Sequence, residues 1–146
     1  TAPPPRIPMN SGPVLAVDPG SAKCGIAVLD TDGQILHLDI VPTAMIGETV
    51  NVVAEEHKAA EILLGTGTCS QAVLEQILVF SRSSDVTPVP EAYTTLLARK
   101  LYWQHNAPGC LMSLVPTGMR IPPRPVDDYA AVAIARRFLA DRRQTP

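Results

Sequence analysis

Four acidic side chains stand where predicted strands or helices begin or end. Asp18 closes the first apolar run, Glu91 follows the last predicted strand, and Asp127 and Asp128 open the last predicted helix. Carboxylate oxygens are the ligands that hard divalent cations such as Mg²⁺ and Mn²⁺ prefer. Two such ions roughly 4 Å apart can stabilise both the attacking and the leaving oxygen when a phosphodiester bond is broken. These residue types therefore predict a metal site able to cut a nucleic acid.

Each of these acids also has a purely structural interpretation. Asp18 precedes a Pro-Gly pair and could simply shape a turn. Glu91 could be a solvated carboxylate on a loop. Asp127 or Asp128 could cap the helix, a contact worth only about 1 kcal/mol. The metal interpretation therefore depends on the combination, because the order of the strands could bring all these ends to one side of a sheet.

The apolar runs predict the elements that position these acids. Runs at Val14–Asp18, 25–29 and 34–41 are separated by turn residues, and the third alternates as a half-buried antiparallel strand does. We therefore expect a three-stranded meander first. Beyond it we expect helices over 47–60, 70–81, 94–105 and 128–142 and strands over Glu61–Gly65 and 85–89. A meander followed by βα units predicts an α/β fold, with a mixed sheet and helices on its faces.

The length and the flanks predict the domain organisation. A chain of 146 residues suits one domain, which we place at 14–146 after a flexible, proline-rich tail at 1–13. Residues 107–125 contain five prolines, and a connection of this length is usually functional or mobile. No apolar run approaches the roughly 18 residues of a membrane span, and no signal peptide is visible. Three cysteines without a CxxC pair suit free thiols, so we expect a cytoplasmic protein with no membrane contact.

The charge distribution bears on the partner. The net charge is −2, yet residues 1–91 carry four basic and eleven acidic side chains, whereas 92–146 carry eight and three. Such asymmetry favours a polyanion partner for the second half, although solvated basic helix faces explain it equally well. On the first interpretation, the side chains that we expect to contact a nucleic acid are Lys23, Thr94, Thr95, Arg99, Lys100, Arg120 and Arg124.

Three segments resemble, in order, the motifs of the YqgF/RuvX family. These are Holliday-junction-resolvase-like nucleases, also associated with trimming the precursor of small-subunit ribosomal RNA. Residues 17–30 (VDPGSAKCGIAVLD) resemble the family opening, an Asp with a Gly two residues on and then Gly-(Ile/Val)-Ala-Val. Residues 90–95 (PEAYTT) resemble Asp-Glu-Arg-Leu-(Ser/Thr)-Thr, and residues 126–132 (VDDYAAV) resemble the closing Val-Asp-x-x-(Ala/Ser)-Ala-Val. The element order agrees from about residue 14 to residue 142.

The resemblance implies a fold and a ligand set. It implies a ribonuclease H-like sheet of five strands, in which Asp18, Glu91 and Asp127 are catalytic and hold two divalent ions, Mg²⁺ or Mn²⁺. Asp128 is the alternative ligand if the register of the last helix is shifted by one. The implied partner is structured RNA or DNA, such as a ribosomal RNA precursor or a Holliday junction, bound by a monomer or a homodimer.

The chain also departs from the family pattern. Pro90 and Ala92 replace the family's Asp and Arg on either side of Glu91, residues 65–67 read Gly-Thr-Gly instead of Gly-Leu-Pro, and the lysine of the first turn sits one place later, at Lys23. Substrate choice and rate are the properties these changes affect. A catalytically weak or inactive nucleic-acid-binding or scaffold domain of the same fold is therefore an alternative. A remote alternative is a nucleotide-binding fragment of the actin and sugar-kinase superfamily, which shares the Asp-x-Gly hairpin but closes two lobes over its ligand.

Overall fold

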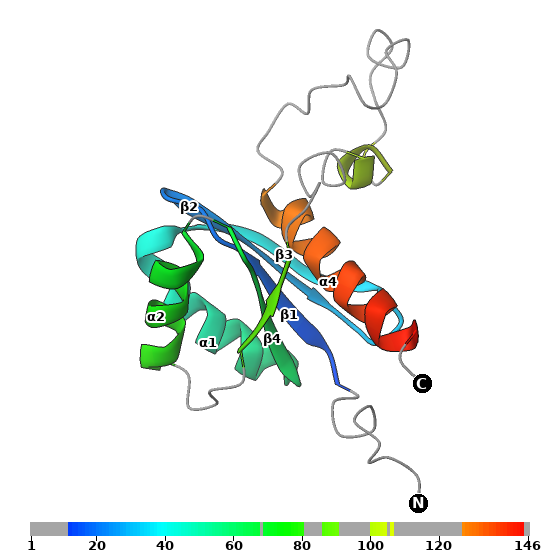
Figure 1. The fold of residues 1–146 in the computed structure, drawn as a ribbon, viewed down its shortest axis with the longest axis horizontal. Coiled ribbons are helices and arrows are strands. Elements are labelled where there is room, and N and C mark those ends of the chain that lie inside the picture. The colour runs from blue at the N-terminus through cyan, green and yellow to red at the C-terminus, as the bar shows by residue number, and fades with distance from the viewer. Residues whose placement is uncertain are drawn as a thin grey trace, which may run out of the picture.

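A computed structural model of the chain describes residues 12–67, 69–80, 86–90, 100–104, 106 and 127–144. These residues form a five-stranded sheet in the order β3-β2-β1-β4-β5 (Figure 1). The strands are β1 (Val14–Asp18), β2 (Lys23–Leu29), β3 (Ile35–Pro42), β4 (Glu61–Gly65) and β5 (Val86–Val89). β1, β2 and β3 are antiparallel neighbours, whereas β4 runs parallel to β1 and β5 runs parallel to β4. The predicted α/β fold with a mixed sheet is confirmed.

Helices cover both faces of this sheet. One face carries α1 (Ile46–His57) and α2 (Ser70–Phe80), and α4 (Asp127–Gln144) crosses the other (Figure 1). A short 3-10 helix, η2 (Thr43–Met45), precedes α1. Two buried clusters separate these layers. Val14 and Ala16 belong to the cluster under α4, whereas Leu15 and Val17 belong to the cluster under α1 and α2. Successive side chains of a strand point to opposite faces, which is why one short strand supplies both cores.

Several predicted boundaries move by a few residues. α1 ends at His57, three residues before the predicted end, because Lys58 adopts a left-handed φ of 53° and its N–H turns back to Ala54 O and Glu55 O. The last helix begins at Asp127 and extends to Gln144. Of the predicted helix over 94–105, residues 100–104 are described and are helical. The proline-rich segment 107–125 lies outside the described residues.

The third strand departs from strict alternation at its start. The register between β2 and β3 shifts between Val28 and Leu29, so that Leu29 pairs with Ile35 and Val28 pairs with His37. Leu36 is the extra residue and is exposed, while Ile35 and Leu38 both pack against the cluster under α4. The strict alternation predicted for this strand is therefore broken at Leu36, because a β-bulge resets it.

The structure describes the last two residues of the predicted flexible tail, Gly12 and Pro13. Residues 1–11 lie outside the described residues, but Pro13 accepts a hydrogen bond of 2.7 Å at its carbonyl oxygen from the Ala60 N–H. This bond joins the chain just before β1 to the chain just before β4. Within the described part, no helix is both long enough and apolar enough to cross a membrane.

Candidate functional site

Three parallel strands end at one edge of the sheet. Val17 pairs with Leu64 and Gly65 pairs with Val89, so the carboxyl ends of β1, β4 and β5 lie side by side. The Thr66 N–H donates to Val89 O at 3.1 Å just beyond the last pair. In open α/β sheets, ligands bind outside the carboxyl ends of the strands. Asp18 is the last residue of β1 and therefore stands at this edge.

The side chain of Asp18 projects on the side of the sheet that α4 covers. It alternates with Val14 and Ala16, which both lie in the cluster under α4. The residue is half-buried. It therefore has access to solvent while one side rests against the protein, as a metal-binding carboxylate requires.

α4 begins at the same edge. Near its other end, Arg136 Nη2 donates to Gly33 O at 3.3 Å, and Gly33 lies in the β2–β3 hairpin beside the start of β1. From Arg136 back to Asp128 the helix rises by about 12 Å. β1 extends by about 13 Å from Val14 to Asp18. The first turn of α4 therefore lies over the strand-end edge, and its last turns lie over the hairpin, as Figure 1 shows.

Asp128 lies on the stripe of α4 that faces the sheet. Ala131 and Ala135, which follow it at helical spacing, are fully buried in the cluster beneath α4. Asp128 itself is only 5% exposed, and its Oδ1 accepts the Tyr129 N–H at 2.9 Å. The backbone of Asp127 begins the helix, but the side chain of Asp127 lies outside the described residues, as does Glu91.

Alanines let α4 approach the sheet closely. Ala16 and Ala27 on the strands and Ala131 and Ala135 on the helix are all fully buried in the same cluster. Short side chains at a packed interface reduce the distance between the two backbones. α4 therefore packs closely on β1 and β2, and its first turn lies toward the edge at which Asp18 ends β1.

The chain beyond β5 returns to this edge. The rings of Tyr102 and Tyr129 meet edge to face with centroids 5.8 Å apart. Asn106 Nδ2 donates to Tyr102 O at 2.9 Å and to the Tyr129 hydroxyl at 3.2 Å. Residues 100–104 and 106 therefore pack on the first turn of α4. Glu91 lies between the end of β5 and this helical segment in the sequence and is outside the described residues.

Two of the predicted substrate contacts fall in the described part. Lys23 is exposed at the start of β2. It lies four residues before Ala27 on the same strand, so both side chains are on the face that α4 covers, the same face as Asp18. Lys100 is exposed on the helical segment 100–104. The other predicted contacts lie outside the described residues: Thr94, Thr95, Arg99, Arg120 and Arg124.

Thr43 and Cys24 contact the turn that follows Asp18. The sequence did not indicate that either residue belongs to the site. The Thr43 hydroxyl donates to Gly20 O at 2.8 Å, and Cys24 Sγ lies 3.4 Å from the same hydroxyl. Burial raises the pKa of the Cys24 thiol above its usual value near 9.0, and the charge of Asp18 adds to this effect. The thiol therefore stays protonated next to the predicted metal site.

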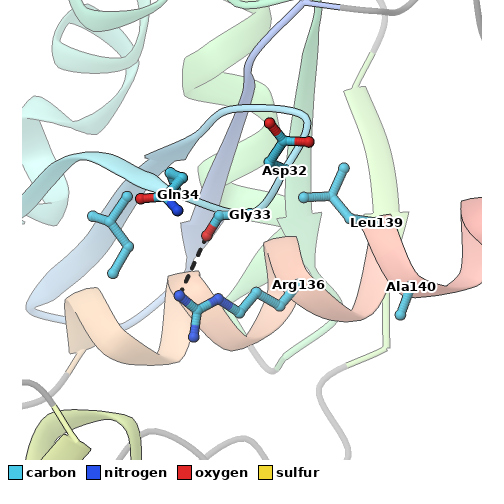
Figure 2. A pocket seen from close by; sticks show the side chains of 7 residues that line it. Asp32, Gly33, Gln34, Arg136, Leu139 and Ala140 are labelled. Atoms are coloured by element: carbon cyan, nitrogen blue, oxygen red, sulfur yellow. Dashed lines mark hydrogen bonds between the residues drawn. The ribbon is translucent and has the colours of Figure 1, made fainter.

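A hollow of about 510 Å³ lies at the opposite end of the molecule, between the β2–β3 hairpin and the end of α4. Figure 2 shows Arg136 extending across it to the carbonyl oxygen of Gly33. That guanidinium holds the hairpin to α4. The hollow is separated from Asp18 by the length of β1, so we assign it no part in the site.

The donor chemistry fits a hard divalent ion. Asp18 and Asp128 offer carboxylate oxygens, the donors that Mg²⁺ and Mn²⁺ take. Among the residues whose side chains are described, no three His, Cys, Asp or Glu side chains are grouped closely enough to hold a metal ion. Glu91 and the side chain of Asp127 lie outside that set. The ligand set of Asp18, Glu91 and Asp127, with Asp128 as the alternative, therefore stays a prediction.

Comparison with known proteins identifies the fold. No protein-family model and no curated protein matches the sequence. The structure of RuvC from Thermus thermophilus is similar, with a TM-score of 0.56 and 20% identity over 91% of this chain and 97% of that one. T. thermophilus RuvC in complex with a Holliday junction substrate gives 0.57 and 19% over the same shares. A ROK hexokinase from T. thermophilus reaches a TM-score of only 0.41, with 18% identity over 60% of this chain and 38% of that one.

These comparisons confirm the ribonuclease H-like fold that the sequence motifs implied. The chain has the RuvC-like arrangement of a mixed five-stranded sheet between helices. At this level of identity the likeness concerns the fold, and function has to be argued from the site.

Proposed function

We propose that this protein is a divalent-metal-dependent nuclease that hydrolyses phosphodiester bonds in structured nucleic acid. The observation that carries the proposal is the position of Asp18. It is a half-buried carboxylate at the carboxyl edge of three parallel strands, on the face where α4 brings Asp128 to the same edge. Support comes from the fold, which the chain shares with RuvC.

Each predicted residue has a role in this proposal. Asp18, Glu91 and Asp127, or Asp128 in place of Asp127, would hold Mg²⁺ or Mn²⁺. Ions bound there would stabilise the attacking and leaving oxygens of the displaced phosphodiester. Lys23, on the same side of the sheet as Asp18, would bind a phosphate beside the scissile bond. The remaining phosphate contacts would come from Thr94, Thr95, Arg99, Lys100, Arg120 and Arg124.

The similarity to RuvC suggests which substrate to test first. One of the similar structures is RuvC in complex with a Holliday junction, so we propose a four-way DNA junction as the first candidate. The motif resemblance to the YqgF/RuvX family adds a precursor of small-subunit ribosomal RNA as the second. We propose action on a branched DNA as a homodimer, because a two-fold substrate is matched by a two-fold protein.

The test is a cleavage panel with a matched pair of variants. Junction DNA, duplex DNA and precursor RNA are incubated with Mg²⁺, Mn²⁺ or excess chelator. Asp18→Asn removes one charge at the site, and Asp32→Asn makes the same change at the exposed hairpin on the opposite end of the sheet. We expect cleavage by the wild type and by Asp32→Asn, and none by folded Asp18→Asn or with chelator. Unchanged cleavage by Asp18→Asn would refute the metal site.

The second candidate is a nucleic-acid-binding domain without nuclease activity. Pro90, which is exposed immediately after β5, stands where the resembled family has an acid, so one carboxylate of that motif is missing. Binding of the same nucleic acids in a gel shift, with no cleavage in either metal, would favour this candidate.

A further inference from the structure

The turn that follows Asp18 is held from a third strand. Asp18 pairs with Gly25, so β2 extends beyond the end of β1 and the turn of residues 19–22 projects past the β1–β2 ladder. Thr43, the first residue after β3, reaches this turn twice. Its N–H donates to Ala22 O at 3.0 Å, and its hydroxyl donates to Gly20 O at 2.8 Å.

Cys24 lies against the same bond. The Thr43 hydroxyl donates its one proton to Gly20 O. Cys24 Sγ lies 3.4 Å from Thr43 Oγ1 and 3.9 Å from Gly20 O, so the buried thiol contacts both groups of this bond. The Thr43 hydroxyl and the Cys24 thiol therefore both lie at the Gly20 carbonyl oxygen.

The turn itself has little room to adjust. A Cβ atom on Gly20 would lie 2.2 Å from Lys23 O, so the two strands of the turn are in direct backbone contact. The turn begins after Asp18 and ends at Lys23. A displacement of Gly20 therefore changes the direction of the Asp18 carboxylate and of the Lys23 ammonium together.

We infer that Thr43 is a positioning residue for this site. By holding the carbonyl groups of Gly20 and Ala22, it fixes the turn that sets Asp18 toward the metal ion and Lys23 toward the phosphate. The inference rests on the proposed function for its consequence, but the restraint on the turn is a property of the metal-free protein. Groups that orient metal ligands at one remove typically change metal affinity or activity by about 10- to 100-fold when they are mutated.

Three variants of the full chain separate this role from general stability. Thr43→Val keeps the shape and loses the hydroxyl, whereas Thr43→Ser keeps the hydroxyl. Thr49→Val makes the same change on α1, at a half-buried threonine on the other side of the sheet. Each variant is measured well below its Tm by hydrogen exchange of the amides at residues 20–23 without metal, and by Mn²⁺ titration followed by electron paramagnetic resonance.

In Thr43→Val we expect amide exchange in the turn to be about 10-fold faster and the Kd for the tightest Mn²⁺ to be about 10-fold higher. Thr43→Ser and Thr49→Val should stay within about 2-fold of the wild type in both measurements. If Thr43→Val does not fold, Thr43→Ala is measured in its place with the same expectations.

The two hypotheses fail in different ways. Wild-type exchange and wild-type Mn²⁺ affinity in Thr43→Val would overturn the positioning role and leave the nuclease proposal standing. Faster exchange with unchanged Mn²⁺ affinity would also overturn the role, because the turn would then move without affecting the site. A wild-type protein that binds no Mn²⁺ would overturn the proposed function, whatever the exchange result shows.

Discussion

Replacing Gly20 by alanine should damage the site much more than it damages the fold. The new Cβ would lie 2.2 Å from Lys23 O, whereas real Cβ atoms essentially never come closer than 3.0 Å. The turn between Asp18 and Lys23 must therefore open by close to 1 Å. A misplacement of about 1 Å in a reacting group can cost about 100-fold in rate. We expect a loss of that order in kcat for metal-dependent cleavage.

The cost in stability should be modest. Overpacking a close backbone contact costs typically about 1–3 kcal/mol. For a domain of this size that corresponds to a Tm roughly 2–12 °C lower. Cleavage is therefore measured at a temperature where both proteins remain folded, alongside thermal denaturation monitored by circular dichroism.

Gly33→Ala is the matched control at the other hairpin. Gly33 has a φ of 88°, which strains any side chain, but a Cβ there meets no atom within 4 Å. This strain costs of order 1–3 kcal/mol, and the hairpin is far from Asp18. We expect a lower Tm with wild-type kcat. Equal kcat in Gly20→Ala and Gly33→Ala would refute the link between the turn and the site.

Three further outcomes are expected. Gly47→Ala would place a Cβ 2.4 Å from Gln76 O between α1 and α2; it should lower the free energy of unfolding by about 1–3 kcal/mol in a denaturant titration and leave cleavage unchanged. Burial raises the pKa of the Cys24 thiol in the folded protein. The contribution of the protonated thiol to the free energy of unfolding is therefore complete below about pH 9 and is lost as the pH rises through the folded pKa. Unfolding free energies should therefore decline above pH 9 more steeply in the wild type than in Cys24→Ala, and parallel declines would contradict this. Asp127→Asn should reduce cleavage by about 100-fold or more in the nuclease panel, while activity lost only in Asp128→Asn would shift the ligand by one residue.

Continuous apolar strands were the easiest elements to predict. β1 and β4 begin and end where the sequence indicated, at Val14–Asp18 and Glu61–Gly65. Both are covered on two faces, so nearly every residue is apolar and the first polar or turn residue marks the end. The same property exposed Asp18 as the acid at a strand end. Its location at the edge of the sheet therefore followed from local pattern and strand order.

Contacts between distant residues left no local pattern. The bond from Thr43 to Gly20 spans 23 positions, and nothing near Thr43 distinguishes it from any threonine after a strand. The bulge at Leu36 depends on pairing with β2, and the early end of α1 depends on the left-handed conformation of Lys58. Asp127 and Asp128 both suit a helix start. Sequence patterns therefore left the choice between these adjacent acids open.

The proposed nucleic-acid partner has to be reconciled with a net charge of −2. The exposed acids of α1 and α2 are Glu48, Glu55, Glu56 and Glu75, and they lie on the face opposite α4. On the α4 side, Lys23 is exposed at the strand-end edge, and Lys100 is exposed on the helical segment 100–104. Exposed charges more than a Debye length apart, about 8 Å at physiological ionic strength, are largely screened from each other. A phosphate backbone that approaches from the α4 side is therefore attracted by nearby lysines, while the sheet separates it from the acidic helices. This distribution of charge argues against nucleic-acid binding on the α1–α2 face. It is compatible with binding at the edge that carries Asp18.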